Sequence, residues 1–432
     1  MRAALLVPLA VLALAGWFRL WGLSQPAATY WDESYYANDA YNYLGGGIPV
    51  THPDDPPVKI EEETTWVHPP LGKWMIAFGE GPLPSTPVGW RLPSALFGLA
   101  GVLLVYLIAL ELWGSAWWAG LAGFLVAVDG LAVVQSRIAM LDVFSATFAL
   151  AGVYLIVLVR TRGRARPDLG RVGGWFGSSY RLGAGFLLGA AVASKWSGAF
   201  ALLLGGVLCA VWCGEEHRTS PGPRTRGRTL LSCFVLVPAA VYVVSYTQFW
   251  IEHGPDLFDF LSLQAQMLAH NLHHASVQVE NSAPWTWPLL LHPIRYIPDQ
   301  AGPMSTTREV LAVGNPALWW GFLALTPFLV ARIVRAADWR TATVTAGYAA
   351  MYLPWLALAR TQFIYYMLPV VPFMGLCVVA VLRSFGNRPR LIATGTLVLT
   401  VSAAAALLAP AWMYLRAGSG WLRAAHLLPG WR

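Results

Sequence analysis

Long apolar segments recur from one end of this chain to the other, and they constrain its fold more than any other feature. Several approach the length of about 20 residues that crosses a bilayer as a helix. The chain is 56% hydrophobic and only 12% charged, with a mean hydropathy of +0.52. Such a chain has too little polar surface to dissolve, which excludes soluble, fibrous and disordered proteins. The sequence therefore predicts an all-α protein that crosses a membrane many times.

The apolar segments predict about eleven membrane-spanning helices. They cover residues 1–22, 91–112, 116–133, 138–159, 181–194, 196–213, 230–250, 316–335, 341–359, 362–382 and 391–413. The stretch 181–213 is divided because Ser194-Lys195-Trp196 interrupts it, and broken helices at membrane depth usually line a cavity. Residues 1–22 also resemble a signal peptide, but the apolar run continues past Ala13-Leu14-Ala15 to Trp21, which favours an uncleaved span.

Arginines between the spans predict the topology, because short cytoplasmic loops are enriched in positive charge. A cytoplasmic N-terminus places seventeen of the 29 Lys and Arg residues in such loops. They are Arg2, Arg160, Arg162, Arg164, Arg166, Arg171, Arg181, Arg218, Arg224, Arg226, Arg228, Arg332, Arg335, Arg340, Arg383, Arg388 and Arg390. We expect a multi-pass protein of the cell membrane with two long extracytoplasmic loops, 23–90 and 251–315. The net charge of +7 then reflects topology, and no nucleic-acid partner is expected.

Cysteine and histidine clusters do not predict a metal site. All four cysteines lie in or beside apolar segments, which argues against a disulfide framework. Cys209, Cys213 and His217 share one helical face, where buried thiols are a simpler interpretation than metal ligands. We expect the acidic segment 52–63 to be solvated surface rather than a calcium site, and the histidines of 270–274 to contact an acceptor or solvent.

Two adjacent carboxylates, Asp32 and Glu33, follow the first span in an aromatic segment that runs from Tyr30 to Tyr36. A carboxylate beside an apolar interface is partly desolvated, which raises its pKa and suits it to act as a general base. These acids are equally compatible with the start of a helix, where the helix dipole favours negative charge.

Cations gather around this segment in the predicted topology. Arg137, Lys195 and Arg360 all fall at the outer side of the membrane, and ionisable residues near membrane depth usually have a function. Arg137 and Asp142, five residues apart, are also compatible with a structural pair, and Arg360 with the cap of a span. The convergence of acids and cations favours one extracytoplasmic cavity.

Two further motifs lie in the first outer loop. Two prolines follow His68 and fix the backbone, so His68 and Lys73 are displayed. Arg91 stands at the start of the next span. Lys73 and Arg91 are also compatible with side chains that simply reach the membrane interface from apolar stems.

A cavity of this kind suits transfer from a phosphorylated lipid. The cations would hold and neutralise a phosphate leaving group, and a carboxylate would remove a proton from an acceptor hydroxyl. Physical reasoning alone equally allows a transporter of an anionic lipid. Such transporters usually show repeated halves, and this sequence shows none.

Eight motifs, in order along the chain, resemble those of protein O-mannosyltransferases, most closely the actinobacterial type. They are Asp32-Glu33, His68-Pro-Pro-Leu-Gly-Lys73, Arg91-Leu-Pro-Ser-Ala-Leu-Phe-Gly98, Ser136-Arg137 to Leu141-Asp142, Ala193-Ser-Lys195-Trp196, Trp285-Thr-Trp-Pro-Leu-Leu-Leu291, Gly314-Asn-Pro316 and Arg360-Thr-Gln-Phe-Ile-Tyr-Tyr366. The resemblance implies a GT-C fold in one transmembrane domain, 1–432. The chain departs from the eukaryotic members in one respect: they carry a soluble MIR domain in the second long outer loop, and the loop 251–315 is too short to hold one, so no MIR domain is expected.

The resemblance implies inverting transfer of mannose from polyprenyl-phosphate-mannose to Ser or Thr of exported polypeptides, at the outer face of the lipid bilayer. The lipid-linked sugar is a substrate, and neither a cofactor nor a metal is implied. A related glycosyltransferase acting on a glycolipid or cell-wall glycan is the alternative, against which the motifs at 68–73 and 194–196 argue. Association with the export translocon stays open.

By similarity, Asp32 is expected to be the catalytic base, and Glu33 to help place acceptor or donor. Lys73 and Arg91 are expected to support this part of the site.

The same similarity assigns the donor phosphate to Arg137, Lys195 and Arg360, with His68 close to it. Asp142 is expected to orient Arg137.

Overall fold

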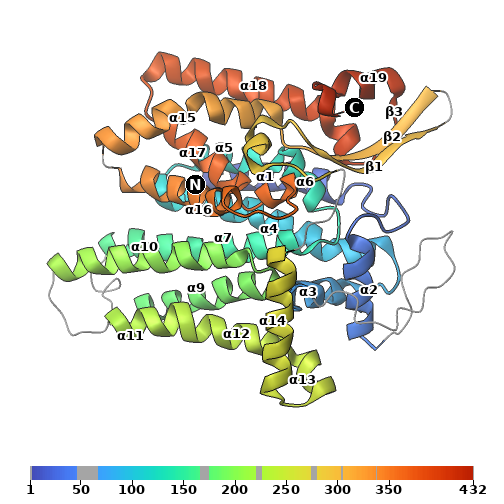
Figure 1. Cartoon of the computed structure of the whole chain (residues 1–432). Coiled ribbons are helices and arrows are strands. Elements are labelled where there is room, and N and C mark those ends of the chain that lie inside the picture. Colours follow the sequence, from blue (N-terminus) through green and yellow to red (C-terminus); the bar gives the residue numbers. More distant parts are fainter. Residues whose placement is uncertain are drawn as a thin grey trace.

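Long helices that run roughly side by side dominate the computed structural model, and short elements gather at one end of them (Figure 1). Residues 2–45, 67–165, 175–219, 226–273, 280–302, 305–336 and 338–431 are described. The long helices and their continuations are α1 (Arg2–Leu20), α4 (Pro87–Trp113), α5 (Ala116–Ala127), α6 (Gly130–Gln135), α7 (Leu141–Ala165), α9 (Trp175–Ser194), α10 (Gly198–Thr219), α11 (Arg226–Leu231), a π-helical turn (Ser232–Leu236), α12 (Val237–Ser245), α15 (Pro316–Ala336), α16 (Trp339–Leu356), α17 (Val371–Leu382) and α18 (Asn387–Trp412).

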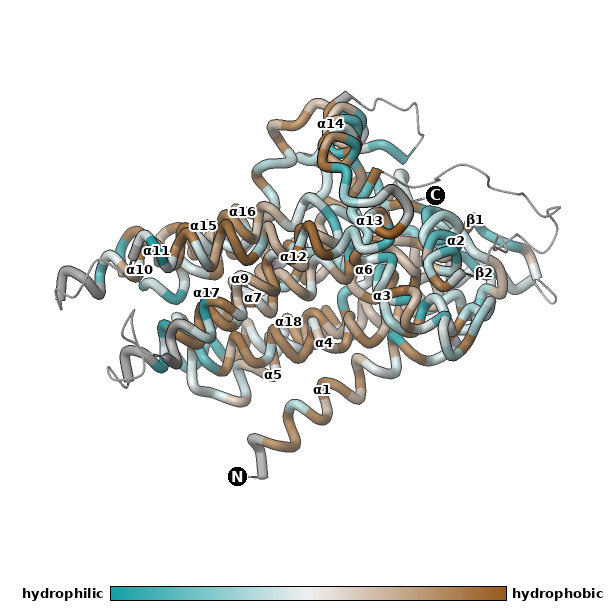
Figure 2. Tube along the Cα trace, turned by 90° about the horizontal axis from the view of Figure 1, so that it is seen from below, coloured by the Kyte–Doolittle hydropathy of each residue, from teal (hydrophilic) through white to brown (hydrophobic). Residues whose placement is uncertain are grey.

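Six helical segments of the described chain are long and apolar enough to cross a membrane. They are Pro87–Trp113, Leu141–Arg162, Gly198–Glu215, Gly227–Ser245, Pro316–Ala336 and Asn387–Trp412. Shorter apolar helices occupy Leu5–Leu20, α5 and α17, and the two other predicted spans coincide with α9 and α16. The prediction of a polytopic helical protein is confirmed, and the count of about eleven crossings stays a prediction. Figure 2 shows the apolar residues concentrated along these helices.

Short elements connect the spans at the end that carries the predicted site. They are α2 (Glu33–Tyr43), α3 (Leu71–Glu80), α13 (Thr247–His253), α14 (Leu257–His273), α19 (Ser419–Ala425) and the 3-10 turns Pro284–Leu289, Ile364–Met367 and Pro429–Trp431. In Figure 1, α14 lies across the long helices rather than along them.

A small β-sheet corrects the all-α prediction. β1 (Ile294–Ala301) pairs antiparallel with β2 (Thr306–Ala312), and β2 pairs with β3 (Ala417–Gly418). The register shifts twice along β1 and β2, after Arg295 and after Ile297. Alternation of apolar and polar residues is the usual signal of a strand, and residues 294–312 show little of it.

The predicted span 116–133 is not one helix, because Asp129 interrupts it. Helix α5 ends at Ala127, and the Asp129 carboxylate accepts a hydrogen bond from the amide of Ala132 at 3.0 Å and so caps α6. The predicted span 362–382 is also divided, since a 3-10 turn precedes α17.

The predicted break near residue 195 is confirmed. Helix α9 ends at Ser194, and α10 begins at Gly198. A Cβ atom at Gly198 would lie 2.4 Å from the backbone carbon of Ala191, so only glycine allows this close return of the chain. Lys195 therefore sits at a fixed interruption between two helices.

The fully buried Asp129 joins distant parts of the chain. Its carboxylate accepts hydrogen bonds from the backbone amide of Asn315 at 2.9 Å and the indole of Trp319 at 2.8 Å. The side-chain amide of Asn315 donates in turn to the carbonyls of Val128, at 3.1 Å, and Val401, at 3.0 Å. These bonds give the Gly314-Asn315-Pro316 motif a structural role, because they join α5, α6, α15 and α18 at one point.

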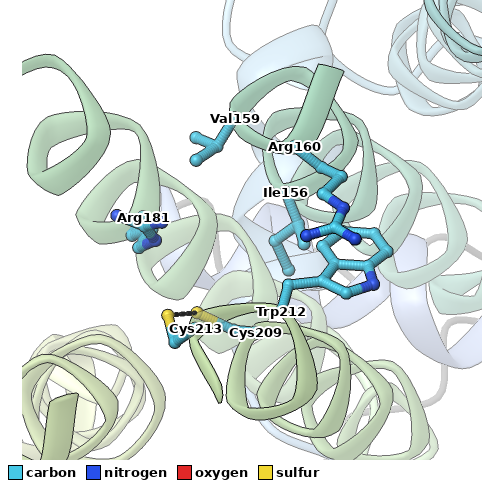
Figure 3. A pocket seen from close by; sticks show the side chains of 7 residues that line it. All are labelled: Ile156, Val159, Arg160, Arg181, Cys209, Trp212 and Cys213. Atoms are coloured by element: carbon cyan, nitrogen blue, oxygen red, sulfur yellow. Dashed lines mark hydrogen bonds between the residues drawn. The ribbon is translucent and has the colours of Figure 1, made fainter. Parts of the chain in front are cut away.

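At the end of α7 remote from Lys195, a small pocket lies between α7, α9 and α10 (Figure 3). Its lining residues are Ile156, Val159, Arg160, Arg181, Cys209, Trp212 and Cys213. Arg160 forms an ion pair with Glu215, and its guanidinium carbon lies 5.2 Å from the ring centroid of Trp212. The Cys209 and Cys213 sulfur atoms are 3.7 Å apart, a contact of buried thiols.

Candidate active site

Asp32 stands on a tight turn in front of α2. Trp31, directly before it, has a φ of 56°, a left-handed conformation that is rare for a residue with a side chain and is frequent at functional sites. The Trp31 ring packs 5.1 Å from that of Tyr296 and 6.1 Å from that of Phe363, centroid to centroid. These contacts hold the turn in place.

The Asp32 carboxylate makes no hydrogen bond or ion pair within the described part of the chain. Its residue precedes α2, yet its side chain does not cap the helix. Burial raises the pKa of Asp32 to about 6, an effect that Lys195 opposes and Asp142 reinforces. The side chain is therefore ionised at neutral pH and is a stronger base than an exposed aspartate.

Glu33 has a different environment although it is the next residue. Its side chain is fully buried and accepts hydrogen bonds from the Arg91 guanidinium at 2.9 and 2.7 Å and from the amide of Ala139 at 3.0 Å. Arg91 also donates to three carbonyls of the segment 23–28. The pair thus joins the turn before α2 to α4, and Glu33 is not open to a substrate.

The Lys195 ammonium is held by Asp142. It donates to both carboxylate oxygens, at 2.8 and 2.7 Å, and lies 5.4 Å from the Tyr365 ring centroid and 4.9 Å from that of Tyr366. The sequence-based expectation that Asp142 orients Arg137 is therefore wrong. Asp142 lies in the first turn of α7 and faces the break between α9 and α10, so its partner comes from another part of the chain.

Arg137 is surrounded by backbone carbonyls. Its guanidinium donates five hydrogen bonds of 2.8 to 3.3 Å at the end of α1 and near the end of α18. The acceptors are the carbonyls of Phe18, Arg19, Trp21, Gly22 and Met413. Arg137 thereby satisfies the last carbonyls of α1, which have no partner within the helix. Few of its donors are left to contact a phosphate.

Arg360 and His68 come from distant parts of the sequence. The Arg360 guanidinium donates to the Asn271 carbonyl at 3.0 Å and to its side-chain oxygen at 2.9 Å, and lies 3.5 Å from the Tyr366 hydroxyl. Burial lowers the pKa of His68 well below its usual range, and the positive charges of Lys195, Lys73, Arg360 and His270 lower it further. His68 is therefore a neutral ring in a cationic environment.

Lys73 connects the two short helices of the first outer loop. Its ammonium lies 2.9 Å from the Asp39 carboxylate, and both side chains are buried. The pair joins α3 to α2, which carries Asp32 at its start. The supporting role expected for Lys73 stays a prediction.

A narrow, mostly apolar cleft extends from Asp142 between α7, α10 and α16. Its lining residues are Asp142, Ser145, Ala146, Ala149, Ser197, Gly198, Met351, Trp355, Tyr366 and Pro369. Asp142 of the Lys195 pair forms its polar end, and two of its walls, α7 and α10, belong to helices long and apolar enough to cross a membrane.

Several residues that shape the site were not predicted from the sequence. Tyr296 accepts a hydrogen bond from the Gln135 amide at 2.5 Å and packs on Trp31, and neither residue carries a signal that sequence alone reveals. Asp129 could have been found, because a lone carboxylate in an apolar run is costly and usually has a role. Asn271 was noted only as part of a histidine-rich segment.

Within the residues that the structure describes, no group of three or more possible metal ligands comes together. The acidic segment 52–63, His274 and the side chains of His217 and His273 lie outside the described residues. Solvation or metal binding at those positions stays a sequence-based interpretation.

Solved structures define the class of protein first. This chain superposes on a chain of the Saccharomyces cerevisiae protein O-mannosyltransferase Pmt1-Pmt2 complex bound to the sugar donor, with a TM-score of 0.83 over 100% of this chain and 93% of that chain, at 15% identity. It also superposes on ArnT from Cupriavidus metallidurans bound to undecaprenyl phosphate, with a TM-score of 0.63 over 93% of this chain and 64% of that chain, at 16% identity. The likeness shows the fold, which is that of GT-C membrane glycosyltransferases.

Sequence comparisons then define the family. The family described as dolichyl-phosphate-mannose-protein mannosyltransferase matches residues 9–251, and the C-terminal four-span region of protein O-mannosyltransferases matches 257–425. A polyprenol-phosphate-mannose–protein mannosyltransferase of Mycolicibacterium smegmatis is 30% identical over 94% of this chain and 87% of its own. That of Mycobacterium tuberculosis is 29% identical over 86% and 78%. The chain belongs to the protein mannosyltransferase family, as the motifs predicted.

Proposed function

We propose that this mannosyltransferase uses Asp32 as the base in an inverting transfer of mannose from polyprenyl-phosphate-mannose to a Ser or Thr hydroxyl of an exported polypeptide. Protein mannosyl transfer itself is the activity of the family. The direction of the transfer, the outer face of the membrane and the roles of individual residues are the proposal.

The reaction is a single displacement at the anomeric carbon. Asp32 takes the proton of the acceptor hydroxyl, and the hydroxyl oxygen attacks the anomeric carbon on the face opposite the phosphate. The bond from that carbon to the phosphate oxygen breaks, and polyprenyl phosphate leaves with the electron pair. The products are an inverted mannoside, polyprenyl phosphate and a protonated Asp32, which returns its proton to water.

Lys195 and Arg360 are the cations best placed to neutralise the leaving phosphate. Lys195 lies close enough to Asp32 to lower its pKa, and Arg360 approaches the same tyrosine, Tyr366. Charge-assisted hydrogen bonds to the phosphate strengthen as its negative charge grows during bond breaking. Neutral His68 can add a hydrogen bond without repelling the two cations.

The cleft between α7, α10 and α16 supports a lipid-linked donor. Its polar end lies at the Lys195 pair, and its walls are formed by membrane helices. A polyprenyl chain beside these walls would place its phosphate at Lys195 and its sugar toward Asp32. The predicted topology of about eleven spans puts this arrangement at the extracytoplasmic side.

One observation carries the proposal. Asp32 and Glu33 are neighbours, and of these two only Asp32 has a carboxylate that makes no hydrogen bond or ion pair within the described residues. This carboxylate lies near Lys195. An unbonded acid beside fixed cations suits proton removal from a bound acceptor.

The test measures transfer of labelled mannose from polyprenyl-phosphate-mannose to a Thr- and Pro-rich secreted peptide. Membranes would contain the wild-type chain, Asp32→Asn or Asp299→Asn. Asp299 is an exposed carboxylate on β1, so its variant is a matched control. We expect Asp32→Asn to lower the rate by about 10²- to 10⁴-fold, the usual contribution of a general base, and Asp299→Asn to retain activity.

Two outcomes would contradict the proposal. Full activity of Asp32→Asn would remove its role as the base. Label in a lipid or glycan fraction instead of the peptide would identify a different acceptor. Inversion is checked separately, from the anomeric configuration of the product.

A further inference from the structure

Asn271 connects three parts of the site that the sequence places far apart. It lies in the last turn of α14, and its side-chain amide donates to the Val67 carbonyl at 3.1 Å. Its side-chain oxygen and its own carbonyl both accept from Arg360, at 2.9 and 3.0 Å. Val67 directly precedes His68, so this one asparagine contacts both the segment of His68 and the guanidinium of Arg360.

The helix end strengthens the contact with Arg360. The last four carbonyls of a helix have no partner within it, and that end carries partial negative charge. Arg360 satisfies the Asn271 carbonyl there and is held by the side-chain oxygen as well. Both acceptors are neutral, so the positive charge of Arg360 is oriented without being cancelled, in contrast to Lys195 beside Asp142.

Helix α14 has a second attachment that does not involve Asn271. The Tyr242 hydroxyl donates to the Gln264 side-chain oxygen at 2.6 Å and accepts from the Trp196 indole at 2.8 Å. Phe260 and Met267 of α14 also form a buried cluster with Tyr246. Removal of the Asn271 side chain should therefore leave α14 in place.

We propose that Asn271 is a positioning residue for the donor phosphate, which it serves by orienting Arg360 and fixing the backbone in front of His68. The inference rests on the proposed function, because it assigns the phosphate to Arg360 and His68. Asn271 touches neither the phosphate nor the sugar. Its effect should appear in donor binding rather than in the chemical step.

The first experiment measures the donor KM and kcat of Asn271→Ala, with Gln266→Ala as the matched control. Gln266 is an exposed amide on the same helix, and within the described part of the chain its side chain bonds only to Ser262 of α14. We expect the donor KM of Asn271→Ala to rise roughly tenfold, as for the loss of one charge-assisted contact, with kcat changed by less than about threefold. Gln266→Ala should match the wild type.

A double-mutant cycle separates positioning from a general structural role. If Asn271 acts through Arg360, its effect on the donor KM should largely disappear in an Arg360→Ala background. Equal effects in both backgrounds would overturn the inference, and so would an unchanged donor KM in Asn271→Ala.

Binding of undecaprenyl phosphate to the purified chain in nanodiscs tests the inference without any transfer reaction. Weaker binding by Asn271→Ala than by the wild type and Gln266→Ala supports it. Equal binding by all three, with normal wild-type transfer, overturns only the role of Asn271. If the wild type neither binds the lipid nor transfers mannose, the proposed function fails first.

Discussion

The region around Arg91 and the region around Lys195 use charge in opposite ways. Near Arg91, each charged group is saturated, since Glu33 and Arg91 bond to each other and to backbone groups. Near Lys195, the neighbouring Asp32 carboxylate has no bond within the described chain, and tyrosine rings cover the ammonium. Buried charge alone therefore does not identify a catalytic group, and the bonds that a charged side chain leaves unused are more informative.

The largest effect is expected from Glu33→Ala. The change leaves the Arg91 guanidinium buried without its counter-charge, and breaking such a pair costs about 3–5 kcal/mol of stability. Thermal unfolding in detergent and the yield of monodisperse protein measure the loss. The double variant Glu33→Ala with Arg91→Met should be more stable than Glu33→Ala alone. If Glu33→Ala were as stable as the wild type, the charged groups around Arg91 would not depend on their mutual bonds, and the proposed difference between the two regions would be wrong.

Lys195→Ala should reduce transfer but not abolish folding. Loss of a hydrogen bond to a charged group weakens binding by about 1.5–3 kcal/mol, or roughly 10- to 150-fold in kcat/KM for the donor. The double variant Lys195→Ala with Asp142→Asn controls for the carboxylate that is left without its partner. If both variants depended on donor concentration as the wild type does, Lys195 would have a structural role, like the charged groups around Arg91.

Arg137→Lys should affect stability rather than the donor. A lysine has three donors on a flexible stem and cannot reproduce five hydrogen bonds from one planar guanidinium. We expect a loss of about 1–2 kcal/mol of unfolding free energy with the donor KM unchanged. A raised donor KM in a variant of wild-type stability would return Arg137 to the phosphate site, where the sequence placed it.

The pH profile should show the smallest effect. Asp32 must be ionised to accept a proton, and burial raises its pKa to about 6, so kcat/KM should fall as the pH drops through 6. One pH unit below that value, the rate should be about tenfold lower. Because the pKa of His68 lies well below its usual range, no second limb is expected between pH 6 and 8. A flat profile down to pH 5 would argue against Asp32 as the base.

The apolar segments of the sequence predicted most of the long helices, and the motifs predicted the family. The helix break at Lys195 was predictable because a charged residue interrupts an apolar run. The different environments of Asp32 and Glu33 were not predictable, because successive residues point in different directions and only the fold decides which one meets Arg91. The Asp142 partner was assigned wrongly for a similar reason, because spacing within one segment does not reveal a partner on another helix.

The two family models match residues 9–251 and 257–425, and the boundary between them falls near α13 and α14. Buried hydrogen bonds nevertheless connect the two regions. Asp129 bonds to Asn315 across the boundary, and Arg137 bonds to the Met413 carbonyl. Two fragments separated at this junction and co-expressed should consequently find each other in the membrane, and neither should be active alone. The two halves are therefore expected to evolve together, because an exchange of either half with a distant relative would have to preserve its buried hydrogen bonds to the remaining half.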